Sequence, residues 1–421
     1  MNPVARALVA HASRRAASTF VSTCLLFLVA TSLQAIDITK LKPTGYVNDF
    51  AHAMDAASEQ RISTYCGILE RATGAQIAVL NHGRLVWSAA YGFRRLDPPL
   101  PMDRNTTTWV ASITKSVFAT YVMQLVERGE FNLDQPVASQ LEKPLNEYEP
   151  YRESASAIVQ DPAWPTVTPR MLLSHTSGLA NFAFIEPDKK MHLRFKPGTQ
   201  FLYSGEGINL VQFLIEQKLH RPLDQLLQDA IFTPLGMTRT GIIYRKEFEA
   251  DVADRYDLDG HFRSQTRRFP ARAAGSMTTS ADDLSRLASA LLDNKIIKPS
   301  TRSQMLRPVF SITSLHQFPL APNEGQGDEA RNVGLAYGIG WGLLTNTRFG
   351  PAFFKEGHGD GAQNYFICFE RQKSCMILLT NSDNGELAFR PLLETILGDT
   401  VTPWEWEGYT PTYIEESRKH P

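Results

Sequence analysis

The stretch Trp109-Val-Ala-Ser-Ile-Thr-Lys-Ser-Val-Phe-Ala-Thr-Tyr-Val-Met123 contains the most informative pattern in this sequence. Apolar residues recur at three- and four-residue spacing from Val117 to Val126, which predicts a buried helix with Ser112 in its first turn. Ser112 and Lys115 are three residues apart and therefore lie on the same side of that helix. Such a serine can attack a carbonyl carbon while Lys115 takes its proton and backbone N–H groups hold the oxyanion. A serine N-cap followed by a solvated lysine is the alternative, and this pattern alone does not exclude it.

The composition is that of an ordinary globular protein. The chain has 421 residues, of which 43% are hydrophobic and 21% charged, so it has enough apolar material for a large core. The formal net charge of -1 gives no electrostatic reason to expect nucleic acid or an acidic membrane as a partner. We therefore expect no nucleic acid as a partner.

The chain begins with a segment typical of exported proteins. Residues 1–35 combine early arginines with the apolar run Phe20 to Leu33, which predicts a signal peptide and a periplasmic or secreted protein. Membrane contact would come only from this segment if it stayed uncleaved. We expect an N-terminal strip and helix over 36–74, one large domain over 75–400 and a C-terminal tail over 401–421.

Cysteine usage gives no sign of a metal site. Cys24 lies in the signal segment, and Cys66, Cys368 and Cys375 remain, none of them with zinc spacing. The odd count argues against a disulfide framework. Cys368 and Cys375 could face each other across a hairpin, but two small apolar strand residues are the favoured interpretation. We expect no metal and no cofactor.

Strands are predicted at both ends of the domain and helices between them. Together they predict an α/β (α+β) fold in which one central antiparallel sheet, built from the N- and C-terminal parts, is flanked by helices, with a mostly helical middle region. Proline-rich Lys143 to Pro169 and polar His316 to Val333 are expected to be exposed loops. The expected strands are Gln76–Leu80, Arg84–Tyr91, Tyr337–Leu343, Ala352–Glu356, Asn364–Glu370 and Cys375–Thr380. The expected helices, besides the one after Ser112, are Ala56–Ala72, Met171–Ser174, Gly207–Lys218, Leu223–Ile231, Ala281–Leu292 and Phe389–Leu397.

The order of several short motifs resembles the serine hydrolases of the class C β-lactamase and penicillin-binding-protein-like family, which includes esterases and D-amino-acid peptidases. The resemblance runs from about Ala75 to Leu397 and implies a β-lactamase/transpeptidase-like fold. It rests on Trp109-Val-Ala-Ser-Ile-Thr-Lys115, Met171-Leu-Leu-Ser-His-Thr-Ser-Gly-Leu179, Pro197-Gly-Thr-Gln-Phe-Leu-Tyr-Ser204, Pro234-Leu-Gly-Met-Thr238, Gly275-Ser-Met-Thr-Thr-Ser280, Tyr337-Gly-Ile-Gly-Trp341 and Gly357-His-Gly-Asp-Gly361.

The family's second motif, Tyr-x-Asn, is represented by Tyr203-Ser-Gly205. The resemblance implies that Tyr203 shares the acid–base work with Lys115, and we expect the nearby ammonium to lower the pKa of the phenol. Gly205 replaces the asparagine whose side-chain amide would contact a substrate amide. Glu206 adds an acid without a family role.

The third motif is represented by His358-Gly359-Asp360. The resemblance places His358 at the cationic position of a sheet-edge strand, with Gly205, Gly359 and Asp360 facing the substrate. Asp360 departs from the family's glycine and either pairs with His358 or narrows the channel. The backbone N–H groups of Ser112 and Gly361 would form the oxyanion hole.

Two further patterns resemble catalytic motifs but are not interpreted as such. Ser382-Asp-Asn384 spells a β-lactamase motif, but it follows the third motif and is interpreted as a polar turn. His175 could suggest a Ser-His-Asp triad, yet the resemblance makes it part of a structural turn.

The sequence therefore predicts a serine hydrolase that forms an acyl-enzyme on Ser112 and acts on esters or on small amides and peptides. A β-lactamase or D,D-peptidase proper is one alternative. A catalytically silent protein that binds peptidoglycan or a partner protein is another, although such a binder would not need Ser112, Lys115 and Tyr203 together.

Overall fold

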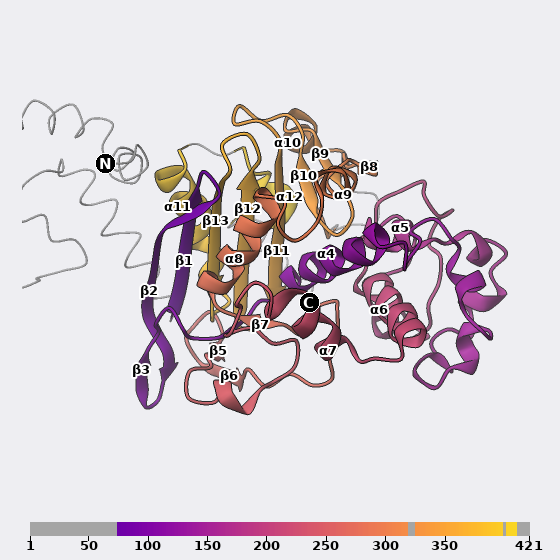
Figure 1. The fold of residues 1–421 in the computed structure, drawn as a ribbon, viewed down its shortest axis with the longest axis horizontal. Coiled ribbons are helices and arrows are strands. Elements are labelled where there is room, and N and C mark those ends of the chain that lie inside the picture. Colours follow the sequence, from indigo (N-terminus) through magenta and orange to yellow (C-terminus); the bar gives the residue numbers. More distant parts are fainter. Residues whose placement is uncertain (1–73, 319–324, 399–400, 411–421) are drawn as a thin grey trace, which may run out of the picture.

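The computed structural model describes residues 74–318, 325–398 and 401–410 (Figure 1). The expectations for residues 1–73, which include the signal peptide, the N-terminal strip and the helix Ala56–Ala72, lie outside the described residues. Within the described ranges, no helix combines the length and the apolar character needed to cross a membrane.

One large antiparallel sheet organises the molecule, as predicted (Figure 1). Its nine strands run in the order β3-β2-β1-β13-β12-β11-β10-β9-β8. The pairing of β1 with β13 joins the N- and C-terminal parts of the domain. The strands are β1 Gly74–Asn81, β2 Arg84–Leu96, β3 Pro99–Pro101, β8 Phe310–Ser311, β9 Leu335–Tyr337, β10 Gly342–Leu344, β11 Ala352–Gly359, β12 Ala362–Phe369 and β13 Ser374–Thr380. Short ribbons pair β4 (Thr108–Trp109) with β7 (Thr278–Thr279) and β5 (Asp254–Tyr256) with β6 (Phe262–Gln265).

Both faces of the sheet are covered, so its strands are apolar on both sides. Alternate residues point to opposite faces: Ala78 joins the core shared with helices α4 (Ile113–Glu127) and α8 (Ala281–Leu292). Its neighbour Ile77 joins a second core, which contains α11 (Phe389–Ile396) and the tryptophans of α12 (Trp404–Glu407). Figure 1 shows α8 lying across the sheet and α4 leading from it to the helical region.

The middle of the chain is helical, as predicted. Its main helix is α6 (Gly205–Leu219), beside α5 (Pro169–Leu173) and α7 (Leu223–Leu227), which continues as a π-helical turn over Gln228–Phe232. Two further short helices, α9 (Pro299–Met305) and α10 (Asp328–Asn332), precede β9.

Two segments expected to be exposed loops are partly buried, so that expectation is wrong. The segment 143–169 forms short 3-10 turns whose Leu145, Ile158 and Trp164 lie in the core around α4. His316 and Gln317 are buried as well. Proline and charge content predicted irregular backbone correctly, but they do not report which side chains of such a segment turn inward.

Residues 401–410 belong to the packed domain, although a tail was expected there. Trp404, Trp406 and Tyr409 are buried in the second core, and the Tyr409 hydroxyl donates to the carbonyl oxygen of Asn364. The domain therefore extends to at least residue 410.

Cys368 and Cys375 form a disulfide, which corrects the favoured interpretation of two unlinked cysteines. They are direct partners in the register of β12 and β13, and their Cα atoms are 4.1 Å apart. The hairpin alone brings the two sulfur atoms within bonding distance.

Candidate active site

The start of α4 presents Ser112 as predicted. Ser112 is the N-cap residue, but its side chain does not cap the helix, so its oxygen is available for other contacts. Ala111 has a φ of 42°, a left-handed conformation that is uncommon for a residue with a Cβ atom. Such strained backbone is concentrated at functional sites.

Lys115 is a buried partner of Ser112 and not a solvated lysine. Its Nζ donates to Ser112 Oγ at 2.8 Å and to the carbonyl oxygen of Ala274 at 2.6 Å, and the residue is 1% exposed. Burial, helped by the charge of Lys355 and opposed by Glu356, holds the pKa of Lys115 well below 10.5. Burial therefore favours the uncharged amine, which is the form that can accept the proton of Ser112.

Tyr203 lies between two lysines, just before α6. Its ring centroid is 5.0 Å from Lys115 Nζ and 4.9 Å from Lys355 Nζ. Burial raises the pKa of the Tyr203 phenol, and this effect exceeds the opposing interactions with Lys355 and Ser112. The expectation that a lysine would lower this pKa is therefore wrong, because desolvation of the phenolate outweighs the nearby charge.

A second cation, Lys355, lies beside Tyr203 on β11, and the sequence interpretation did not consider it. Strand β10 pairs with β11 only over residues 352–354, so the rest of β11 has an edge free of β10. Lys355 Nζ forms an ion pair with Glu356 on this part of the strand. Gly357 follows, and a Cβ there would meet the carbonyl oxygen of Val110 at 2.3 Å, so only glycine lets β11 approach the start of α4 this closely. Lys355-Glu356-Gly357 has the cation-x-glycine spacing of the motif three residues before the segment that we assigned.

His358 lines the cavity but does not supply the expected cation. Its ring packs edge-on against Tyr409 with 4.7 Å between centroids, and its Nε2 is 3.9 Å from a Glu386 carboxylate oxygen. Burial, opposed by Glu356, lowers the pKa of His358 to about 4. The imidazole is therefore uncharged at neutral pH, which corrects its predicted role.

Gly361 is not an oxyanion donor in this structure. Because β11 continues to Gly359, Asp360 and Gly361 form the turn to β12, where Gly361 has a φ of 70°. Its N–H donates to the Asp383 carboxylate, and Gly361 does not line the cavity. The predicted oxyanion role of Gly361 therefore does not fit this geometry.

Asp360 and Gly359 do line the cavity, as predicted. Asp360 lies beside two arginines instead of pairing with His358. Its backbone carbonyl oxygen accepts a hydrogen bond from Arg255. Burial lowers the pKa of Arg268, and the negative charge of Asp360 acts in the opposite direction. A Cβ on Gly359 would meet the Trp109 ring at 2.2 Å, so this glycine allows the ring to cover the strand.

Gly205 is covered by other side chains and does not face the cavity, contrary to the prediction. Its N–H donates to Asn181 Oδ1 at 2.9 Å, and a Cβ there would meet the Phe182 ring at 2.6 Å. Asn181 and Phe182 line the cavity in its place. Glu206 anchors the same segment, since its carboxylate accepts from the N–H of Ala183.

The start of α4, Tyr203 and the end of β11 surround one cavity of about 660 Å³. Ser112, Lys115 and Tyr203 lie among its lining residues. Its aromatic lining residues are Trp109, Phe182, Phe184, Phe269 and Phe318. Its charged lining residues, besides Lys115, are Glu206, Arg268, Arg272, Glu356 and Asp360.

The two motifs that were set aside lie outside the cavity lining. His175 is fully buried, its Nδ1 accepts from the N–H of Ser204 at 3.1 Å, and its ring stacks on Tyr203 at 4.3 Å. It supports the position of Tyr203. Ser382 and Asn384 bond to each other in the turn after β13.

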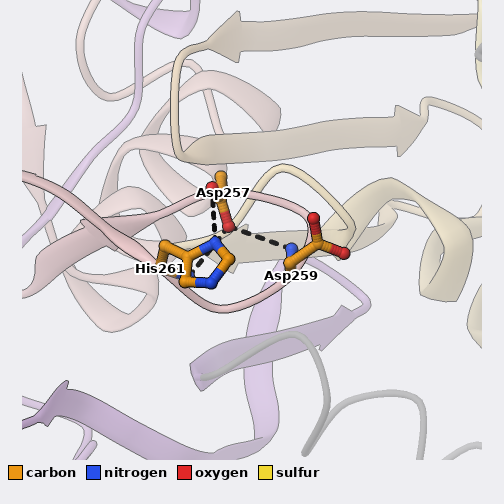
Figure 2. Close-up of side chains that lie close together, drawn as sticks. All are labelled: Asp257, Asp259 and His261. Atoms are coloured by element: carbon orange, nitrogen blue, oxygen red, sulfur yellow. Dashed lines mark hydrogen bonds and ion pairs between the residues drawn. The ribbon is translucent and has the colours of Figure 1, made fainter.

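One group of side chains in the described part of the chain has the proximity needed for a metal ion: Asp257, Asp259 and His261, between β5 and β6 (Figure 2). The Asp257 carboxylate already accepts from the N–H groups of Asp259 and His261 and contacts His261 Nδ1. This cluster closes a hairpin turn away from the cavity lining.

Comparisons with known proteins identify the family and the fold of this chain. A family model described as Beta-lactamase matches residues 61–397. A Bacillus subtilis protein named penicillin-binding protein PbpX is 25% identical over 277 residues, covering 62% of this chain and 66% of its own length. Esterase EstB of Burkholderia gladioli is 24% identical over 351 residues, covering 71% of this chain and 82% of the esterase. The solved octameric penicillin-binding protein homologue from Pyrococcus abyssi covers 86% of this chain and 81% of its own, at 22% identity and a TM-score of 0.65, which shows a shared fold.

Proposed function

Because this chain belongs to the Beta-lactamase family, we propose that it is a serine hydrolase that forms an acyl-enzyme on Ser112 and acts best on esters and small amides. The observation that carries the proposal is the 2.8 Å hydrogen bond from a buried lysine to the oxygen of Ser112. A binding protein has no need of an uncharged amine held against a serine hydroxyl.

In the proposed mechanism, Ser112 Oγ attacks the substrate carbonyl carbon and its proton passes to Lys115 Nζ. The N–H of Ser112 and a backbone N–H on the free edge of β11 hold the oxyanion. The neutral phenol of Tyr203 then passes a proton to the leaving group, and Lys115 restores it. In the second half-reaction a water molecule loses a proton to the same groups and attacks the acyl carbon, which releases the acid and Ser112.

The lowered pKa of Lys115 predicts the pH dependence of this reaction. A protonated Lys115 cannot accept the proton of Ser112, so kcat/KM should fall as the pH drops through the pKa of Lys115 and level off above it. The plateau should be reached well below pH 10.5. Initial rates on p-nitrophenyl butyrate, corrected for spontaneous hydrolysis, provide the measurement. A rate that keeps rising to the ordinary pKa of lysine would contradict the assignment.

Esters are expected to be far better substrates than β-lactams, because the anchors for a lactam are weakened. Lys355 does not line the cavity and is paired with Glu356, whose carboxylate does line it and would repel a lactam carboxylate. The side-chain amide of the family's second motif is absent at Gly205. Losing two such contacts costs about two to four powers of ten in specificity if each contributes roughly 1.5 to 3 kcal/mol.

The comparison is kcat/KM for p-nitrophenyl butyrate against nitrocefin on one preparation. Nitrocefin turnover equal to that of the ester would favour the alternative, a β-lactamase or D,D-peptidase proper. The aromatic cavity lining supports the ester assignment, because it offers apolar surface to an acyl chain.

We also propose that the protein acts outside the cytoplasm. Two observations support this: the signal-like residues 1–35 and the Cys368–Cys375 disulfide, a bond that persists mainly in oxidising compartments. Fractionation of expressing cells and N-terminal sequencing of the mature chain test it. A full-length, cytoplasmic protein with free thiols would refute it.

A further inference from the structure

Three buried polar atoms on the lining of the cavity have no hydrogen-bond partner among the described residues. They are Glu356 Oε2, Gln317 Oε1 and His358 Nε2. All three residues line the cavity that contains Ser112. Buried polar atoms are normally paired, so such a cluster beside a reactive serine calls for an explanation.

The backbone fixes these three groups side by side. Glu356 and His358 are two residues apart on β11 and therefore point to the same face of the strand. Gln317 is held by its N–H, which donates to the carbonyl oxygen of Trp406 at 2.8 Å. Its side-chain NH2 donates to Glu356 Oε1 at 3.0 Å, which leaves the amide oxygen as the unused group.

The unused atoms are all able to accept hydrogen bonds. Burial acts to raise the pKa of Glu356, but the charge and hydrogen bond of Lys355 outweigh it and keep Glu356 ionised. Lys355 bonds to Oε1, so Oε2 stays without a donor. The uncharged imidazole of His358 can accept a hydrogen bond at Nε2 when its proton is on Nδ1.

A primary ammonium group matches this set of acceptors. It carries three N–H donors and a positive charge, and a hydrogen bond from it to a carboxylate is stronger than one between neutral groups. A carboxylate or phosphate would instead place its own acceptors against these acceptors.

We propose that Glu356, Gln317 and His358 form a subsite for a primary ammonium group of the substrate. The substrate is then an ester or amide of an amino acid whose free amine lies near the scissile carbonyl. This inference rests on the proposed serine hydrolase function and narrows its substrate class.

Matched pairs of substrates test it. The benzyl ester of 2-aminobutyric acid, as each enantiomer, is compared with benzyl butyrate by pH-stat titration, at a pH where the amine is protonated. For the wild-type enzyme, kcat/KM should be at least about tenfold higher for one aminoacyl enantiomer, because a site built to hydrogen-bond a group rejects the analogue that lacks it. A preference for benzyl butyrate over both enantiomers would overturn the subsite.

Single substitutions test which residues cause the preference for the aminoacyl ester. Glu356→Gln and Gln317→Leu should each reduce the aminoacyl preference by about tenfold. Glu206→Gln makes the same change at another cavity-lining carboxylate and should leave the preference unaltered. An unchanged preference in Glu356→Gln, or an equal loss in Glu206→Gln, would overturn the assignment of these residues.

A wild-type measurement keeps the test valid if the variants fold poorly. n-Butylammonium should inhibit hydrolysis of benzyl butyrate competitively, at concentrations at least about tenfold lower than n-butanol. Equal inhibition by the two compounds would contradict the subsite. Labelling by a fluorophosphonate probe separates the two proposals: a labelled enzyme without amine preference refutes the subsite alone, whereas a protein that is not labelled refutes the hydrolase function.

Discussion

Replacing Ser112 with alanine is expected to abolish turnover and leave the fold intact. The change removes one small oxygen atom that does not cap α4, so the helix keeps its backbone contacts. Activity on p-nitrophenyl butyrate should fall by several orders of magnitude, because a covalent mechanism loses its nucleophile. Steady-state kinetics together with thermal unfolding followed by circular dichroism provide the measurement.

Ser276→Ala is the matched control for this variant. Ser276 also lines the cavity, but its hydroxyl bonds to the carbonyl oxygen of Ile242 and not to Lys115. This control should keep most of its activity. A Ser112→Ala enzyme that retained more than a few per cent of wild-type activity would refute the nucleophile assignment.

Lys115→Met and Tyr203→Phe are each expected to lose most of the acylation rate, and the double variant should be little worse than the worse single variant. One proton passes between the side chains of Ser112, Lys115 and Tyr203. When residues act as one unit in this way, the losses of rate caused by their single substitutions do not add up in the double variant. Burst-phase kinetics on the four enzymes of this cycle measure the coupling.

Tyr337→Phe is the control for loss of a phenolic hydroxyl. Tyr337 is also fully buried, its ring contacts His175, and its hydroxyl has no hydrogen-bond partner in the described part of the chain. Losses that multiply in the Lys115→Met/Tyr203→Phe double variant would show that the two residues act independently and would exclude the shared proton-transfer unit.

The contact between Ser112 and Lys115 could be predicted from sequence because its geometry is local. Residues three apart on a helix share a side whatever the rest of the chain does, and the apolar spacing after Val117 identified the helix. The order of strands and helices also sufficed to place the N- and C-terminal parts in one sheet, since those strands are distinct apolar runs.

The cation beside Tyr203 could not be predicted because it depends on how β11 packs against its neighbours. The sequence has two candidate cations on this strand: Lys355 is followed by Glu356-Gly357, and His358 by Gly359-Asp360. Only the structure shows that Lys355 Nζ lies 4.9 Å from the Tyr203 ring centroid and that His358 lines the cavity. It also shows that the N–H of Gly361 donates to Asp383, a long-range contact without a local signal.

The charge states of the site residues could not be predicted from the sequence either. The resemblance implied that Tyr203 lies beside Lys115, but the direction of the pKa shift of Tyr203 follows from burial, which no local pattern reports. Likewise, Asn181 and Phe182 occupy the space at Gly205 because the loop before α6 folds back on that helix, a long-range contact without a local signal.

The nucleophile is tested most directly by labelling it covalently and locating the label. Wild-type protein and Ser112→Ala are treated with a fluorophosphonate probe, which loses fluoride and leaves its phosphonyl group on a reactive serine, and their intact masses and peptide maps are recorded. If Ser112 is the nucleophile, the wild-type protein carries a single adduct on the peptide that contains Ser112, and the variant carries none. An adduct on another residue, or equal labelling of both proteins, would contradict it.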